Sequence, residues 1–234
     1  MSFQAENLSE PKRRIVCVIK TSGALSMSEL ASLLDLSGEA VRQHLLHLEK
    51  DGWIVRISEK HNGIGRPHIR YQLTTAGEHL FEKNYDHLTI EVLDTLVNHL
   101  GINTLKEVLT AMIDERVCEW EPKLHGLSTK ERLMVLKDFY AKDDSYMEVV
   151  KKGNDYYLIE RNCPFHNVAL KRPILCSVTV SVLTKLLGCK VQREQRFQNG
   201  DGCCAFRIQQ NEQVDNNAPC LIIEDQSSNI MPKE

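Results

Sequence analysis

The chain has 234 residues, of which 42% are hydrophobic and 26% charged, and this composition is typical of a soluble globular protein of one or two domains. The formal net charge is −3, but residues 11–70 contain ten Lys or Arg against six Asp or Glu, so a basic N-terminal part precedes an acidic remainder. The first residues do not read as a signal peptide, and no uncharged run near the cysteines could span a bilayer. We therefore expect a cytoplasmic protein that does not enter the membrane and whose basic part can face a polyanion.

The basic part has the pattern of a helix-turn-helix. An apolar run predicts a first helix over residues 12–22. Ser26-Met-Ser-Glu29 matches the capping box that begins a second helix. Ser37 is a suitable N-cap for a third helix over residues 38–51, whose apolar positions form an inner stripe.

The third helix presents residue types that read base edges in the major groove, although a solvated helix face is the alternative interpretation. Trp53–Ile57 and Tyr71–Thr74 read as two strands, and Gly63 and Gly65 between them favour a tight bend. Three helices and such a hairpin indicate a winged helix whose wing contacts phosphate or the minor groove. The candidate DNA-binding residues are Ser37, Glu39, Ala40, Arg42, Gln43, His47, Arg66 and His68.

Helical periodicity dominates the middle of the chain, and strand patterns dominate its later part. A helical stripe from Thr74 to about residue 100 is expected either to form a dimer interface, which would match two half-sites, or to dock on its own domain. Further helices are expected over 103–121 and 128–141, and strands over 146–150, 155–160, 190–197 and 204–209. Residues 174–188 fit both a strand and a helix, and we favour the helix.

These patterns predict an α+β fold made of successive regions. They are a disordered N-terminus (1–10), a winged helix-turn-helix DNA-binding domain (11–75), a helical linker or dimerisation region (76–142), a cysteine-rich α+β domain (143–210) and a flexible C-terminal tail (211–234).

Five of the eight cysteines fall between residues 163 and 204, with the spacing C-x12-C-x12-C-x13-CC. In a reducing compartment, grouped cysteines indicate metal or redox chemistry rather than structural disulfides. Thiolates suit zinc, copper(I) and iron–sulfur clusters. Structural zinc sites prefer short C-x2–4-C pairs, which this sequence lacks, so zinc is the weaker interpretation.

The helix-turn-helix, the G-x-G-R-P wing and the stretches N-C-P-F-H-N-V-A and L-L-G-C-x-V-x-R…G-D-x-x-C-x-F-x-I resemble one regulator family. This family comprises the iron–sulfur transcriptional repressors of the Suf cluster-assembly operon (SufR), within the ArsR/DeoR-like winged-helix regulators. The resemblance covers about residues 12–209. It implies a homodimer with one [4Fe-4S] cluster per subunit, which represses cluster-assembly (suf) genes with the cluster bound and releases operator DNA without it. The ligands that it implies are Cys163, Cys176, Cys189 and Cys204.

Several alternatives remain open on the residues alone. Cys203 is an alternative to Cys204, although the C-x-F-x-I register favours Cys204, and His166 is an alternative to Cys189. The stretch G-D-G-C-C-A-F-R-I also resembles the end of bacterial ligand-sensing domains of the vinyl-reductase type, so the C-terminal domain could instead sense a small ligand, zinc or thiol oxidation. An electron-transfer protein or an enzyme is a third interpretation, but the phosphate loop, the nucleophile elbow and the HExxH motif are missing, so we do not expect an enzyme.

Overall fold

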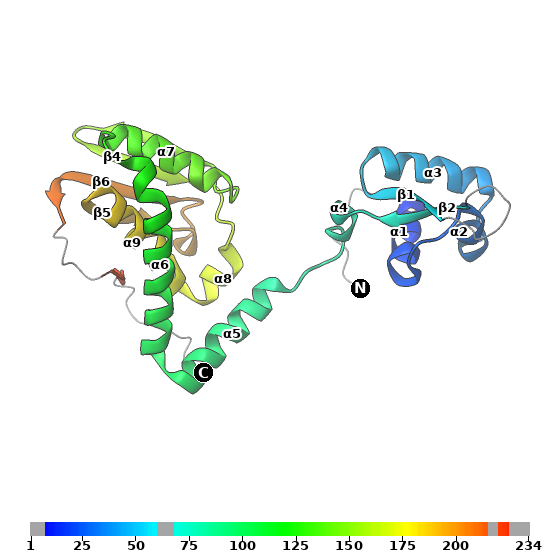
Figure 1. Ribbon diagram of the computed structural model, residues 1–234, viewed down its shortest axis with the longest axis horizontal. Coiled ribbons are helices and arrows are strands. Elements are labelled where there is room, and N and C mark those ends of the chain that lie inside the picture. Colours follow the sequence, from blue (N-terminus) through cyan, green and yellow to red (C-terminus); the bar gives the residue numbers. More distant parts are fainter. Residues whose placement is uncertain (1–7, 60–67, 215–219, 225–234) are drawn as a thin grey trace. The chain divides into compact units, whose positions relative to one another are not determined.

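The computed structural model describes residues 8–59, 68–214 and 220–224 (Figure 1). The chain divides into two compact units, Met1–Asn84 and Tyr85–Glu234. The predicted α+β class is confirmed: a winged helix-turn-helix is followed by helices and then by a sheet domain that carries the cysteines. None of the described helices is both long enough and apolar enough to cross a bilayer.

The first unit is a helix-turn-helix followed by an antiparallel hairpin. Its elements are α1 (Glu10–Ser22), α2 (Met27–Leu34), α3 (Gly38–Lys50), β1 (Ile54–Glu59), β2 (His68–Leu73) and α4 (Thr75–Glu78). The predicted capping box begins α2: the Ser26 hydroxyl accepts from the Glu29 amide, and the Glu29 carboxylate accepts from the Ser26 amide at 2.7 Å. Apolar residues of α1, α2, α3 and both strands form one core, which fixes the outward face of α3.

The helical region predicted from Thr74 to about residue 100 is interrupted. Helix α4 has four residues, and the next helix begins only at Tyr85. A side chain at Gly77 would place its Cβ 2.1 Å from the carbonyl oxygen of Trp53, so α4 lies directly against the hairpin. Leu80 and Phe81 are then buried in the core of the first unit. A continuous helix would carry these two apolar residues away from that core.

The second unit combines helices with a four-stranded antiparallel sheet. Its helices are α5 (Tyr85–Leu100), α6 (Ile102–Leu124), α7 (Thr129–Ala141), α8 (His166–Lys171) and α9 (Cys176–Leu187), with short 3-10 turns at Pro173–Leu175 and Phe197–Asn199. Its strands are β3 (Met147–Lys152), β4 (Asp155–Glu160), β5 (Cys189–Gln195) and β6 (Cys204–Gln213), in the order β3-β4-β6-β5. The ambiguous segment 174–188 is therefore helical, as expected.

One hydrophobic core joins the helices and the sheet of this unit. Helix α9 packs against α6 and against β5 (Figure 1). Leu109 of α6 and Leu136 of α7 share the core with Leu158 of β4 and Phe206 of β6. The core also reaches beyond the sheet, because Cys220, Leu221 and Ile222 pack against it. The described part of the C-terminal segment is thus attached to the sheet domain.

Candidate functional site

Helix α3 presents the predicted base-reading residues outward. Ser37 is its N-cap, and the Ser37 hydroxyl accepts a hydrogen bond from the Ala40 amide at 3.2 Å. This bond satisfies one of the free amides at the helix start. Ala40 is half-buried, and the exposed predicted residues of the helix are Glu39, Arg42, Gln43 and His47.

Glu39 holds two of these side chains in place. Its carboxylate accepts from Arg42 Nε at 2.8 Å, from Arg42 NH2 at 2.7 Å and from Gln43 Nε2 at 2.9 Å. The hydrogen bonds from Arg42, and then that from Gln43, lower the pKa of Glu39 to about 2. Glu39 is therefore ionised at neutral pH, and its carboxylate fixes the orientation of the Arg42 guanidinium on the exposed face of α3.

Replacing Glu39 by alanine is expected to reduce sequence discrimination. The change releases Arg42 and Gln43 and removes a negative charge that repels phosphate, so binding to unrelated duplex DNA should strengthen severalfold. The ratio of specific to unrelated affinity should fall. Fluorescence anisotropy against a selected site and a scrambled duplex measures that ratio, with Glu10→Ala, which removes an exposed acid from the first turn of α1, as the control. An unchanged ratio would contradict the role of Glu39.

The wing is described only in part. His68 is exposed at the first position of β2, where the register pairs it with Glu59 at the end of β1. Arg66, Gly63 and Gly65 lie outside the described residues. Arg70 of β2 donates to the Ala24 carbonyl in the loop before α2 at 2.9 Å and to Glu29 Oε1 of α2 at 3.0 Å.

Three of the predicted ligands, Cys163, Cys176 and Cys204, line one cavity of about 380 Å³ in the second unit. Cys163 follows β4, Cys176 is the first residue of α9, and Cys204 is the first residue of β6. Each thiol therefore comes from a different structural element. Glu160 and His166 line the same cavity.

The cavity disfavours negative charge on its thiols in the absence of a cation. Burial is the largest cause that raises the pKa of Cys163 to about 12 and that of Cys204 to about 11. Burial likewise raises the pKa of Glu160 to about 7. These groups lower one another's tendency to ionise, because the electrostatic neighbours of Cys163 include Glu160, Cys176 and Cys204. Without a cation in the cavity, Cys163 and Cys204 are protonated at neutral pH.

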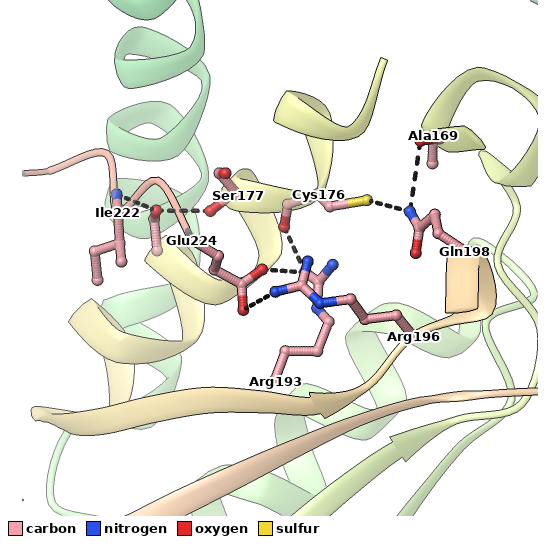
Figure 2. Close-up of polar contacts among 9 residues, drawn as sticks. Ala169, Cys176, Ser177, Arg193, Arg196, Gln198, Ile222 and Glu224 are labelled. Carbon is pink, nitrogen blue, oxygen red and sulfur yellow. Dashed lines mark hydrogen bonds and ion pairs between the residues drawn. The ribbon is translucent and has the colours of Figure 1, made fainter. Parts of the chain in front are cut away.

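Nitrogen donors approach the Cys176 side of the cavity (Figure 2). Gln198 Nε2 donates to Cys176 Sγ at 3.0 Å, and Arg193 NH2 donates to the Cys176 carbonyl oxygen at 2.6 Å. The guanidinium of Arg193 also stacks over the ring of Phe206, with 4.9 Å between its central carbon and the ring centroid. A buried arginine therefore holds positive charge beside the thiols.

The other two clustered cysteines lie elsewhere. Cys189 is buried at the start of β5 and is absent from the cavity lining, with Arg132 and Asp155 as electrostatic neighbours. Cys203 is buried and directs its thiol at Gln195 Oε1, 3.5 Å away. Cys203 immediately precedes β6, and of the adjacent pair only Cys204 lines the cavity.

The thiols line the cavity but do not converge on the position of a single metal ion. Among residues 8–59, 68–214 and 220–224, no three His, Cys, Asp or Glu side chains lie close enough together to hold a single metal ion. A tetrahedral zinc site needs its donors within about 2.3 Å of one ion. The three thiols instead line one shared cavity of about 380 Å³.

Most of the remaining cavity wall is apolar. Helices α5 and α6 and the residues around them supply it, through Val92, Leu93, Leu96, Leu105, Val108, Leu109, Met112, Phe165, Leu175 and Val178. Three buried polar atoms of the lining, Tyr140 Oη, Arg193 Nε and Gln198 Oε1, have no hydrogen-bond partner among the described residues. A buried polar atom without a hydrogen-bond partner destabilises the folded protein, so these atoms are available to hydrogen-bond to a molecule in the cavity.

Comparisons with known proteins find one family match within each of the two compact units of the chain. Residues 8–55 match the model of winged helix-turn-helix DNA-binding domains, and residues 130–209 match the model of methanogen output domain 1. The search of curated proteins finds no match.

Three similar solved structures cover about half of the chain. RV1404 from Mycobacterium tuberculosis is 21% identical over 47% of this chain and 74% of its own, with a TM-score of 0.30. A MarR family transcriptional regulator from Silicibacter pomeroyi is 19% identical over 48% of this chain and 74% of its own, with a TM-score of 0.29. The S. aureus MepR–DNA complex is 23% identical over 48% of this chain and 80% of its own, with a TM-score of 0.28. The family matches and the helix order together assign the first unit as a DNA-binding winged helix-turn-helix. The chain joins this domain to a cysteine-bearing domain similar to methanogen output domain 1.

Proposed function

We propose that this regulator binds operator DNA as a homodimer and senses iron–sulfur supply through a [4Fe-4S] cluster in the cysteine cavity, repressing suf genes when the cluster is bound. One observation carries the proposal: Cys163, Cys176 and Cys204, which are distant in sequence, line one cavity of a chain that also has a DNA-binding domain. Thiolates are the usual protein ligands of such clusters.

The residues around the cavity suit such a cluster. Its iron would supply the positive charge that lets the buried thiols lose their protons. Gln198 already donates to the Cys176 sulfur, and hydrogen bonds to sulfur stabilise the anionic form of a thiolate-bound cluster. Arg193 would offset the remaining negative charge. The donor set therefore fits a cluster better than a closed zinc site.

The fourth ligand that we propose is His166 rather than Cys189. His166 lines the cavity, and its ring lies edge-on to Phe197, with ring centroids 5.5 Å apart. Cys189 is held at the start of β5 and does not line the cavity. Histidine replaces cysteine at some iron–sulfur centres, so this ligand set is chemically reasonable.

Helix α5 is the surface that we propose for dimerisation. Tyr85 and Leu88 lie about one turn apart on this helix and keep 65% and 58% of their surface, and Val92, which also lines the cavity, keeps 55%. A contiguous apolar face of this kind on a helix favours burial against a second copy. Two copies would match the two half-sites of an operator.

Replacing Leu88 by glutamate is expected to convert the dimer into a monomer, because the charge would have to be buried in the interface. Affinity for a two-half-site operator should fall at least about tenfold, because the second half-site contact is no longer tethered to the first. Sedimentation velocity measures the first effect. Leu33→Glu is the matched control, since Leu33 of α2 is also 58% exposed. A Leu88→Glu protein that stays dimeric would contradict this interface.

Anaerobic purification with analysis of iron, acid-labile sulfide and zinc tests the cluster itself. We expect about four irons and four sulfides per chain, with visible absorption. Stoichiometric zinc without sulfide would contradict the proposal.

A small-ligand sensor is the second candidate function. The apolar wall and the unpaired atoms Tyr140 Oη and Gln198 Oε1 favour an occupant with an apolar body and a polar head. The same analysis separates the candidates, because a ligand sensor would remain free of iron after anaerobic reconstitution and would instead be stabilised by an amphipathic compound.

A further inference from the structure

A short C-terminal segment, Cys220–Glu224, lies across α6 and α9, and we call it the strap. Cys220 Sγ contacts Asp114 Oδ1 of α6 at 3.1 Å. The Ile222 amide donates to Ser181 Oγ of α9 at 2.9 Å. Leu221 and Ile222 pack against the core. The strap is therefore seated by apolar contacts and by hydrogen bonds to two helices.

The end of the strap is an ion-paired carboxylate. Glu224 Oε2 lies 3.6 Å from Arg193 NH2, and Glu224 Oε1 lies 3.3 Å from Arg196 NH2. The side chain of Arg193 is 2% exposed and that of Glu224 is 12% exposed. Figure 2 shows both guanidinium groups directed at this carboxylate. A pair this deeply buried is screened little by solvent.

Arg193 connects the strap to the cavity. Its guanidinium lines the cavity and donates to the Cys176 carbonyl. Burial disfavours the charged form of Arg193, but Glu224 first, and then Cys176 and Cys204, outweigh burial and raise its pKa. The same positive charge is therefore an electrostatic neighbour of both the strap carboxylate and the thiols of Cys176 and Cys204.

We propose that the strap is part of the sensor: Glu224 and a negatively charged group in the cavity compete for Arg193, so that loading of the cavity loosens the strap. The inference rests on the proposed function, because a cluster held by three or more thiolates is the negatively charged group. Arg196 allows Arg193 to turn from Glu224 towards the cavity, because the ion pair between Arg196 and Glu224 remains. Thermodynamic linkage is reciprocal, so a change that weakens docking of the strap should raise the affinity of the cavity for the negatively charged group.

Glu224→Gln tests this competition, because it removes the charge and retains the shape. The control is Glu212→Gln, which breaks the half-exposed ion pair between Glu212 and Lys190 on the same sheet. In iron-free protein, the variant should exchange the Ile222 amide for deuterium faster than the wild type. In loaded protein, it should lose iron to a chelator roughly tenfold more slowly. Loading of the wild type should itself speed exchange at Ile222.

The outcomes distinguish this inference from the proposed function. Protein that binds no iron contradicts the proposed function and the competition with it. Stoichiometric iron combined with unchanged Ile222 exchange on loading contradicts the competition alone. Equal rates of iron loss from Glu224→Gln and from the wild type would overturn it as well.

Discussion

Replacing Cys163 by serine is expected to abolish stoichiometric cluster binding. The change removes a thiolate and leaves a hydroxyl, which is a hard and weak ligand for iron. Iron should fall from about four per chain to well below one after anaerobic reconstitution, with sulfide falling in parallel. Operator binding should then match that of cluster-free protein. Circular dichroism and a thermal melt establish that the variant is folded.

Matched cysteine variants sharpen this test. Cys118 is exposed on α6 and does not line the cavity, so Cys118→Ser should retain all of its iron. Cys189→Ser should also retain it, whereas His166→Ala should lose it, if His166 is the fourth ligand. Retention of iron by Cys163→Ser would remove Cys163 from the ligand set. Loss of iron from Cys189→Ser but not from His166→Ala would restore Cys189 to that set.

Replacing Arg42 by alanine is expected to cause the largest loss of specific DNA binding. A guanidinium that reads a guanine edge contributes about 1–3 kcal/mol of discrimination, which corresponds to a loss of roughly 5- to 150-fold in operator affinity. Binding to unrelated duplex DNA should weaken much less, because phosphate contacts dominate there. Fluorescence anisotropy against the selected operator and a scrambled duplex measures both.

The control for Arg42→Ala removes the same charge elsewhere. Arg161→Ala lies in the second unit, where Arg161 forms an exposed ion pair with Glu148. Its operator affinity should be close to that of the wild type. Both variants should keep their iron, since neither side chain lines the cavity. Equal operator affinities of Arg42→Ala and the wild type would refute the assignment of α3 as the recognition helix.

Local signals predicted most of the fold. The capping box at Ser26 and the N-cap at Ser37 act on adjacent backbone amides, so the sequence alone places these helix starts. The strands β3 and β4 were predictable because Gly153, with a positive φ of 60°, marks the turn between them. The interruption after α4 was not, because it depends on the close contact of Gly77 with Trp53, which is distant in sequence.

The candidate site was only partly predictable. Spacing identified the cysteines, but whether a thiol reaches the cavity depends on where each strand begins and which face it turns inward. Cys189, Val191 and Arg193 share the inner face of β5, yet only Arg193, at the far end, lines the cavity. Arg193 and Glu160 could have been found as charged residues at inward positions of alternating strands. The apolar run Cys220-Leu-Ile-Ile stands out from the polar C-terminal segment, but the sequence does not identify its partners, which lie on α6, α9 and β5.

The most direct test of the central claim is the operator affinity of one anaerobic preparation measured with its cluster and again after chelation has removed it. The operator is a duplex selected by the loaded protein from a random pool. We expect tight binding by the loaded protein and a loss of at least about tenfold on cluster removal, restored by reconstitution. Equal affinity in the two states, with iron and sulfide shown to be present and then absent, would contradict it.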